Sequence, residues 1–387
     1  MGIEIGAQPS FRDSEVPLAQ DSRKRAVRRR RNSFRTYPSP TEAMSKPTKA
    51  WKLGGSRRRS LPPELAPLVD WFETQEDARE RFRWVLRDSL DECLDGQRTG
   101  RWCYQHLTKT EKTYLGTAVE VNLTKEFEID NGVDLDWRVA QMDVDCKFSK
   151  DLGGWEIPME MYVCADHGER SGNADRPALL VWLNDDTSQW AVGAIMISDQ
   201  VLRWKIAKGK QERVRAYNRD NKRRLDPGHA DDVYWLWGGL QTDLPTNLIL
   251  NLPDDVRARI FSFTTSGQRR VNQLFREVQG RIVGRQTVLT VAQQDDAPKR
   301  ARDARLQLRD DGVIVLGHQG VHPRIASALG LMVPVKGEWV AARVRHAAVG
   351  DAKSFEVDGE RWTLANESDP VEPAPDLPSD AARYGRW

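Results

Sequence analysis

Charged and apolar side chains alternate over the segment 143–148. Asp143, Asp145 and Lys147 would lie on one face of a β-strand, because successive side chains of a strand point to opposite faces. Carboxylate oxygens are the ligands that hard divalent cations prefer. A lysine two residues after a carboxylate can orient an attacking water and offset the charge of a phosphate group. The pattern therefore predicts a metal-dependent nuclease site.

Two upstream acids strengthen this interpretation. An isolated Asp-x-Lys is common and usually belongs to a solvated strand edge. Here Asp136 lies nine residues before Asp145, and Glu120 lies in an amphipathic helical stretch among apolar neighbours. The order Glu, Asp, Asp-x-Lys is typical of PD-(D/E)xK nucleases, in which one helix and two adjoining strands bring these groups together.

Several longer blocks resemble the NaeI type II restriction endonuclease family. They occur in the family's order across roughly residues 70–375, at 95–101, 109–113, 116–123, 143–147, 152–158, 269–276, 278–285 and 291–296. The resemblance implies a site-specific endonuclease that hydrolyses duplex DNA with Mg²⁺, stimulated by a second bound DNA copy. It also implies a homodimer and a cognate DNA methyltransferase in the same system, although not as a stable subunit.

The resemblance carries over to individual residues. Glu120, Asp136, Asp145 and Lys147 would form the catalytic set. Glu120, Asp136, Asp145 and the Cys146 carbonyl would hold the metal, and Lys147 would position the water. Asp143 shares the strand face, and its sequence leaves open whether it supports the metal ligands or is simply exposed.

The expected fold class is α/β: a PD-(D/E)xK restriction-endonuclease-like domain followed by a mainly helical winged helix-turn-helix domain. We predict four segments: a disordered basic extension at 1–60, a catalytic domain at 61–243, a DNA-binding domain at 244–365 and a flexible tail at 366–387. Helices are expected in the catalytic domain at 64–94 and 110–127, and strands at 134–140, 142–149, 178–184 and 190–198. The charged stretch 205–224 is interpreted as a surface helix or loop that is either solvated or contacts phosphates. The segment 167–176 would be an inserted loop beside the cleft.

Candidate DNA contacts fall in both predicted domains. Arginine and glutamine suit base edges, and arginine and lysine suit phosphates equally well. The predicted DNA-binding residues are Gln97, Arg98, Arg101, Arg269, Arg270, Arg285, Lys299, Arg300 and Arg302. Each could instead be an ordinary charged surface residue.

Composition limits the remaining possibilities. The 387 residues carry a net charge of +2, but residues 1–60 hold 15 Lys/Arg against 5 Asp/Glu, so the rest of the chain carries about −8. DNA contact there must come from local patches. The four cysteines have no metal-ligand spacing. They are expected to be reduced and buried in a cytoplasmic protein. No apolar stretch approaches a membrane span.

Two other functions remain open from the sequence. One is a DNA-binding regulator without catalytic activity, which the intact set of four catalytic side chains disfavours. The other is a repair nuclease that nicks one strand at a lesion.

Overall fold

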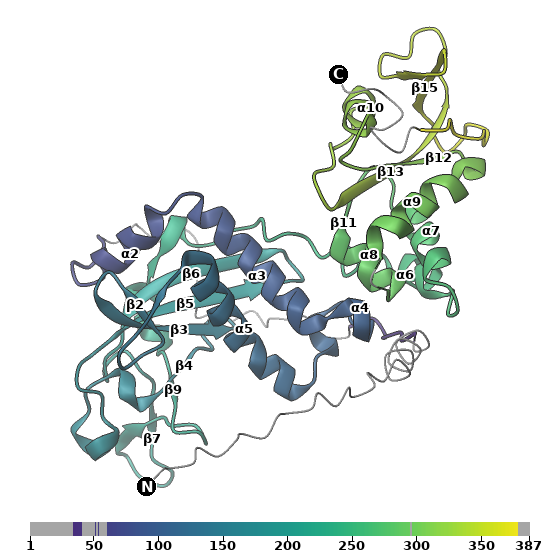
Figure 1. Ribbon diagram of the computed structural model, residues 1–387. Coiled ribbons are helices and arrows are strands. Elements are labelled where there is room, and N and C mark those ends of the chain that lie inside the picture. Colours follow the sequence, from purple (N-terminus) through teal and green to yellow (C-terminus); the bar gives the residue numbers. More distant parts are fainter. Residues whose placement is uncertain (1–33, 41–50, 52, 54–59, 295, 378–387) are drawn as a thin grey trace, which may run out of the picture. The chain divides into compact units, whose positions relative to one another are not determined.

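The computed structural model describes residues 34–40, 51, 53, 60–294 and 296–377 (Figure 1). Within these residues the protein is a mixed α/β structure with several sheets, which confirms the fold class at that level. The basic run 23–31 of the predicted extension and the last ten residues of the predicted tail lie outside the described residues.

A six-stranded sheet forms the centre of the first part of the chain. Its strand order is β1-β2-β3-β5-β6-β10. All neighbouring strands are antiparallel except β3 and β5, which are parallel. The bounds are Asp130–Asn131 (β1), Trp137–Val139 (β2), Met142–Ser149 (β3), Pro177–Asn184 (β5), Gln189–Met196 (β6) and Tyr234–Trp235 (β10). The four strands predicted from the sequence are β2, β3, β5 and β6.

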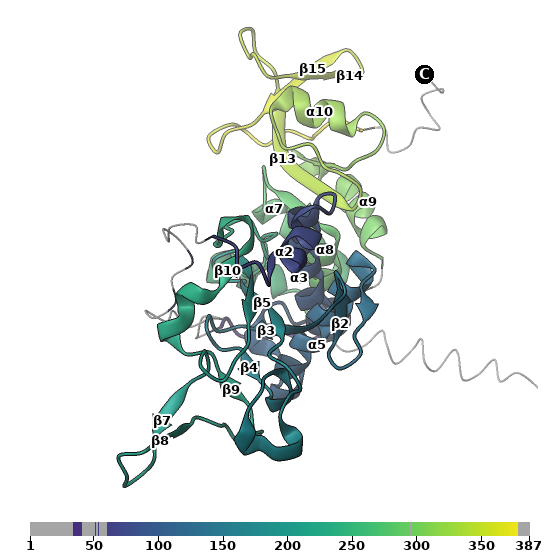
Figure 2. The ribbon, with the colours of Figure 1, turned by 90° about the vertical axis from the view of Figure 1, so that its left-hand side faces the viewer.

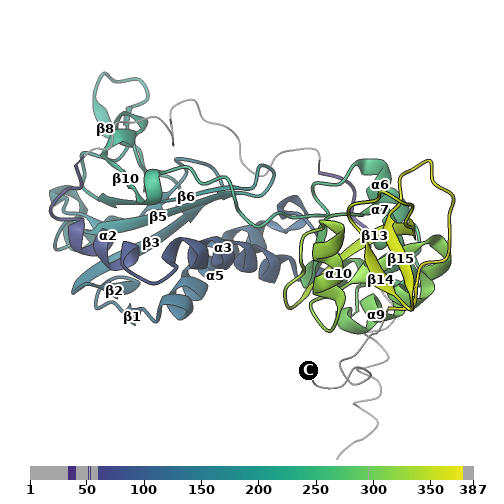
Figure 3. The same ribbon diagram turned by 90° about the horizontal axis from the view of Figure 1, so that it is seen from above.

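Three helices cover one face of this sheet, and Figure 3 shows two of them, α3 and α5, lying along it. They are α2 (Ala66–Glu73), α3 (Ala78–Leu94) and α5 (Lys109–Phe127), with the short α4 (Gly96–Thr99) after α3. Thr108 begins α5 with a capping box, in which its side chain accepts from the Glu111 amide and Glu111 reaches back to the Thr108 amide. The predicted helix at 64–94 is thus two helices, because the chain turns at Asp77, where φ is +50°.

The opposite face of the sheet packs against a second apolar cluster. This cluster includes Trp155, Tyr162 and Trp182, and the segments that supply it contain two small sheets. One sheet pairs β4 (Glu156–Ile157) with β9 (Arg223–Arg224), and the other pairs β7 (Trp204–Ile206) with β8 (Arg213–Arg215). The stretch 205–224, predicted as a helix or loop, is therefore mostly a β-hairpin. Its alternating Trp204-Lys-Ile206 pattern was too short to indicate a strand against so many charges.

The last part of the chain alternates helices and strands. Its helices are α6 (Asp254–Phe261), α7 (Gly267–Glu277), α8 (Arg285–Ala292), α9 (Ala297–Gln307) and α10 (His322–Leu329). Its strands are β11 (Ile282–Gly284), β12 (Val313–Leu316), β13 (Glu338–His346), β14 (Phe355–Val357) and β15 (Glu360–Leu364). Both β11 and β12 pair antiparallel with β13, so β13 lies between them. The apolar core changes between Leu244, which packs with the first sheet, and Leu248, which packs with these helices.

Two segments expected to lack structure contain buried residues. Trp51 and Leu53 are 5% and 8% exposed, and Trp51 packs beside Gly153, where a Cβ atom would lie 1.9 Å from the indole nitrogen. Ala374 and Leu377 are also buried, and the Ala374 amide donates to the Arg309 carbonyl at 2.8 Å. The sequence did not indicate burial at these positions, because isolated apolar residues in a polar stretch give no periodic signal.

Replacing Trp51 by alanine should therefore destabilise the protein by about 3 kcal/mol, the usual cost of removing a buried aromatic side chain. Urea denaturation measures this change. Val349→Ala is the matched control, since Val349 is fully exposed, and it should change stability by less than about 0.5 kcal/mol. Equal stability of the Trp51→Ala variant and the parent would contradict the packing of this segment.

Candidate active site

A tight hairpin sets the spacing of the predicted catalytic acids. Ala140 and Gln141 join β2 to β3 with φ values of +48° and +68°, the pair of conformations that a type I′ turn needs. Trp137 pairs with Val144 across this hairpin. Continuing the register by one residue places Asp136 opposite Asp145. The nine-residue spacing noted in the sequence is thus the geometry of a two-residue turn.

The strand alternation agrees with the prediction. Val144 and Cys146 pack into the core under the helices. On the other face, the Lys147 ammonium contacts the Asp145 carboxylate and lies 4.0 Å from Asp136 Oδ2. The Cys146 amide donates to Asp136 Oδ2 at 3.2 Å. The structure therefore brings Asp136, Asp145 and Lys147 together.

Burial and the facing carboxylate perturb the site's protonation. Burial raises the pKa of Asp145 to about 8, helped by its hydrogen bond with Asp136 and opposed by Lys147. Burial alone would lower the pKa of Lys147, but the two carboxylates outweigh it and the pKa is raised. The ammonium supplies the positive charge that two facing carboxylates require.

Glu120 reaches the same electrostatic environment from α5. Its side chain is half-buried, and burial followed by repulsion from Asp136 raises its pKa, while Lys147 opposes that shift. The helix is positioned by Leu115, Val119 and Leu123, which are all buried against the sheet. Glu120 therefore lies close enough to the acidic pair to be affected by its charge.

Asp143 has a different place from its neighbours on the strand. It is 3% exposed, and its carboxylate accepts hydrogen bonds from the backbone amides of Val133 (3.2 Å) and Asp134 (2.9 Å). These amides belong to the loop that ends at Asp136. Because two backbone amides stabilise its charged form, the pKa of Asp143 is lowered even though burial acts to raise it. Asp143 thus holds the loop that presents Asp136, a role the sequence left open.

Carboxylate oxygens are suitable ligands for a hard divalent cation, but here they are not already arranged around a metal-binding position. Asp136 and Asp145 offer carboxylate oxygens on one face. Among the described residues, no three His, Cys, Asp or Glu side chains lie in a ready metal-binding arrangement. A metal would have to replace the Lys147 ammonium between the two carboxylates, and the lysine would then be free to face the substrate.

Two arginines predicted to contact DNA are instead buried and hydrogen-bonded within the protein. Arg101 is 9% exposed and donates to the Cys93 and Leu94 carbonyls at the end of α3 and to Glu111 at 2.6 Å. Arg270 is 3% exposed and donates to the Val291 and Ala292 carbonyls at 2.7 Å each. Each satisfies carbonyls that a helix end leaves without intrahelical partners, so neither fits the predicted DNA contact.

Gln97 and Arg98 border an acidic pocket of about 650 Å³. The Arg98 side chain is 73% exposed, but it pairs with Asp95 at 3.1 Å. The carboxylates that line the pocket are Asp88, Asp91, Glu92, Asp95 and Glu126. This environment repels phosphate, so it does not favour DNA contact by these two residues.

The predicted contacts of the last part of the chain are mostly accessible. Arg269, Arg285, Lys299 and Arg302 are exposed, and Arg300 is partly exposed. Lys299 pairs with Asp303 at 2.5 Å along α9.

A basic pocket of about 500 Å³ gathers two of these residues. It brings Arg285 and Arg302 together with Arg305, Lys336 and Trp339, and its described lining contains no carboxylate. Sequence reasoning missed Lys336, which lies 34 residues beyond Arg302 with no local signal.

The cysteine and membrane expectations can also be compared with the structure. Cys93, Cys103, Cys146 and Cys164 are free and buried, which confirms that they pack as small apolar side chains. Among the described residues, no helix combines the length and the hydropathy needed to span a bilayer.

Comparison with known proteins defines the class to which this fold and site belong. The family model described as restriction endonuclease NaeI matches residues 68–373. The type II restriction enzyme NaeI of Lentzea aerocolonigenes is 43% identical over 314 residues, which cover 78% of this chain and 90% of that enzyme. The protein is thus a homologue of type II restriction endonucleases, a class that binds DNA and generally depends on a metal ion. Within that class, the chain belongs to the restriction endonuclease NaeI family.

Replacing Arg101 by methionine should lower stability by about 2 kcal/mol, because two helix-end carbonyls and Glu111 lose their partner. Hydrogen bonding to Arg101 lowers the pKa of Glu111 to about 2. The stabilisation from this pair is therefore full above about pH 4.5 and is lost as the pH falls towards 2. Denaturation at pH 7 and pH 3 measures the difference. Arg98→Met is the control; a stable Arg101→Met protein with weakened DNA binding would contradict the structural role.

The raised pKa of Asp145 predicts a pH-dependent metal affinity. A protonated carboxyl cannot ligate a metal, so the Mg²⁺ affinity of the protein should rise between pH 6 and pH 8 and level off above the pKa of about 8. Below that pKa the change should approach about tenfold per pH unit. Calorimetric titration with Mg²⁺ measures it, with the exposed Asp358→Asn variant as the control. An affinity independent of pH in this range would contradict the assignment.

Proposed function

We propose that this protein is a Mg²⁺-dependent endonuclease that cuts both strands of duplex DNA at a specific sequence. The observation that carries the proposal is the pairing of Asp136 with Asp145 across the β2–β3 hairpin, with Lys147 between them. Membership of a restriction endonuclease family supports the same conclusion. In this account the sheet with α3 and α5 is a PD-(D/E)xK nuclease domain.

Asp136, Asp145 and the Cys146 carbonyl would hold the Mg²⁺ ion. In a strand the amide and carbonyl of one residue point to the same side. The β2–β3 pairing ends at Trp137 and Val144, and beyond it the Cys146 amide points towards Asp136. The Cys146 carbonyl therefore faces the side of the strand on which Asp136 lies. When bound, Mg²⁺ would make a coordinated water more acidic and offset charge on the scissile phosphate.

The protein's own groups would then arrange the reaction. The Lys147 ammonium would hold the attacking water and stabilise negative charge that develops on the phosphate. Glu120 would complete the acidic environment from α5. Asp143 would keep the Asp136 loop in place through its two backbone hydrogen bonds.

We also propose a winged helix-turn-helix for the last part of the chain. The order α7, β11, α8, α9, β12, β13, with β13 between the other two strands, supports this assignment. In such a module α9 would enter the major groove and the segment between β12 and β13 would form the wing. The basic pocket lies between α9 and that segment, where a phosphate backbone would pass.

A homodimer would place two nuclease sites on opposite strands of a palindromic target. Binding of a second DNA copy and a cognate methyltransferase in the same system belong to the same proposal. They rest on the family alone.

Replacing Asp145 by asparagine or Lys147 by methionine should reduce cleavage at least about 10³-fold, since each removes a group that acts on the reacting atoms. Binding of duplex DNA should remain, because most of the affinity comes from cationic contacts elsewhere. Supercoiled plasmid cleavage and fluorescence anisotropy measure the two effects, with Asp358→Asn as the matched control.

The plasmid products also separate the alternatives. Linear product from the parent protein supports a restriction enzyme, whereas accumulated nicked circles indicate a nuclease that cuts one strand. Binding without any Mg²⁺-dependent product would favour a DNA-binding regulator. Normal cleavage by either variant would contradict this active site.

A further inference from the structure

The β7–β8 hairpin concentrates positive charge on a short projecting element. Residues 203–224 contain ten Lys/Arg and only two acidic residues, Glu212 and Asp220. The whole chain has a net charge of +2, so this segment of +8 leaves −6 on the rest. Figure 2 shows the hairpin extending away from the sheet.

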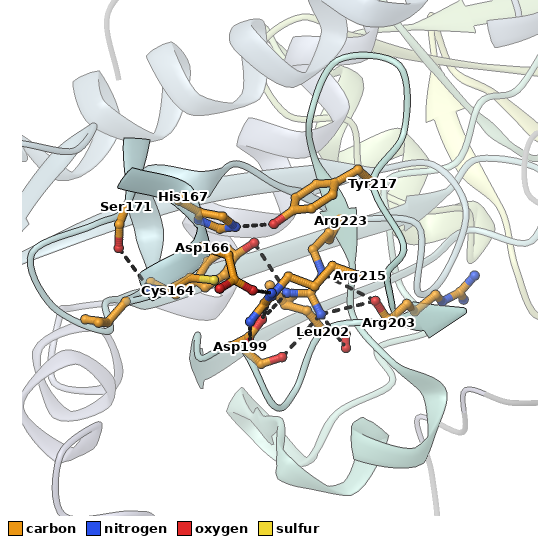
Figure 4. Close-up of polar contacts among 12 residues, drawn as sticks. Cys164, Asp166, His167, Ser171, Asp199, Leu202, Arg203, Arg215, Tyr217 and Arg223 are labelled. Carbon is orange, nitrogen blue, oxygen red and sulfur yellow. Dashed lines mark hydrogen bonds and ion pairs between the residues drawn. The ribbon is translucent and has the colours of Figure 1, made fainter. Parts of the chain in front are cut away.

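Two of these arginines are used to fix the base of the hairpin. Arg223 is fully buried, contacts the Asp199 carboxylate and donates to the Leu202 carbonyl at 3.1 Å. Arg215 donates to the two Asp199 oxygens at 2.8 and 2.7 Å. Figure 4 shows both guanidinium groups directed at Asp199. Asp199 thus anchors the base of the hairpin through two arginines, of which Arg223 is fully buried.

The cations nearer the tip have a different environment. Lys205, Lys208, Lys210 and Arg213 are exposed, and none forms an ion pair with any residue that the structure describes. Asp199 thus neutralises the base, and four cations remain on the exposed part of the hairpin, where Glu212 is the only acidic residue of 204–215. Such a cluster is unfavourable by itself and favourable beside a polyanion.

Side-chain contacts also link the hairpin to the loop that ends at Asp136. The segment from Cys164 to Arg176 contacts the base of the hairpin, where Asp166 pairs with Arg215 and His167 hydrogen-bonds with Tyr217 (Figure 4). At its other end, Arg176 pairs with Asp134 at 2.9 Å. Asp134 lies two residues before Asp136. One short segment thus joins the hairpin base to the loop that presents a catalytic carboxylate.

We propose that the β7–β8 hairpin is an arm that binds the phosphate backbone of the duplex being cut, at positions flanking the cleaved site. The hairpin spans about six residues from base to tip, a reach of roughly 20 Å at about 3.3 Å per residue. This reach is shorter than one helical turn of the duplex (~34 Å), so the tip would contact backbone near the cleaved site and not several turns away. The inference rests on the proposed function, because it needs a duplex seated at Asp136 and Asp145.

A charge-removal experiment tests the arm. The full chain carrying Lys208→Gln and Lys210→Gln is compared with the parent, both with Asp145→Asn to prevent cutting, on a duplex holding the site mapped from the parent's digestion products. The affinity of the variant should be roughly tenfold lower at low salt, and the slope of log affinity against log salt should be smaller by about 2. A matched control removes two exposed lysines of α5, Lys109→Gln and Lys125→Gln, and should keep the parent's affinity and salt slope.

Photocrosslinking locates the contact. The four native cysteines are buried, so Lys208→Cys can be labelled selectively with a photoactivated crosslinker, with Lys125→Cys beside the acidic pocket as the control. The arm predicts crosslinks to backbone positions on the cut duplex, within about one helical turn (~34 Å) of the scissile phosphate. Crosslinks at no fixed distance from the cut, or only to a second duplex or to protein, would overturn the proposal.

The outcomes separate this inference from the proposed function. If the parent cuts DNA and the Lys208/Lys210 variant has the parent's affinity and salt slope, the arm is refuted while the nuclease stands. If the parent cuts no DNA with Mg²⁺, both are refuted.

Discussion

The structure depends on one unfavourable contact, the placement of Asp136 opposite Asp145 across a tight hairpin. Like charges opposite one another on neighbouring strands destabilise a sheet, and burial of Asp145 increases the cost. Lys147, two residues further along the same strand, balances the pair. The hairpin turn, the two amides held by Asp143 and the parallel pairing of β3 with β5 all keep these groups in place. A site built this way has a need for positive charge, which a divalent cation can meet.

Much of this arrangement could be predicted from the sequence. The alternation in 143–148 gave the correct faces, because a strand has only two. The nine-residue spacing between Asp136 and Asp145 places them opposite each other, because the turn at Ala140 and Gln141 has two residues. The regular helices and the four main strands were also predicted, since their apolar residues recur with clear periods.

The sequence was least informative about what a charged side chain contacts. Arg101 and Arg98 belong to one polar stretch, yet Arg101 closes the end of α3 while Arg98 is exposed. Sequence cannot separate the two, because helix-end carbonyls become acceptors only after the chain has folded. The same reasoning applies to Arg270, and in reverse to Lys336, which joins the basic pocket only through tertiary structure. The sequence also could not show the role of Asp143, because its partners are backbone amides of a loop about ten residues earlier in the chain.

We propose that the facing carboxylates form the centre of a metal-dependent, sequence-specific DNA-cutting site. The most direct test of this proposal is digestion of a phage genome by the purified full chain with Mg²⁺, beside the same reaction in EDTA, followed by sequencing of every new end. We expect ends that share one short palindromic sequence, arise on both strands and are missing in EDTA. Ends without a common sequence, or none that depend on Mg²⁺, would contradict it.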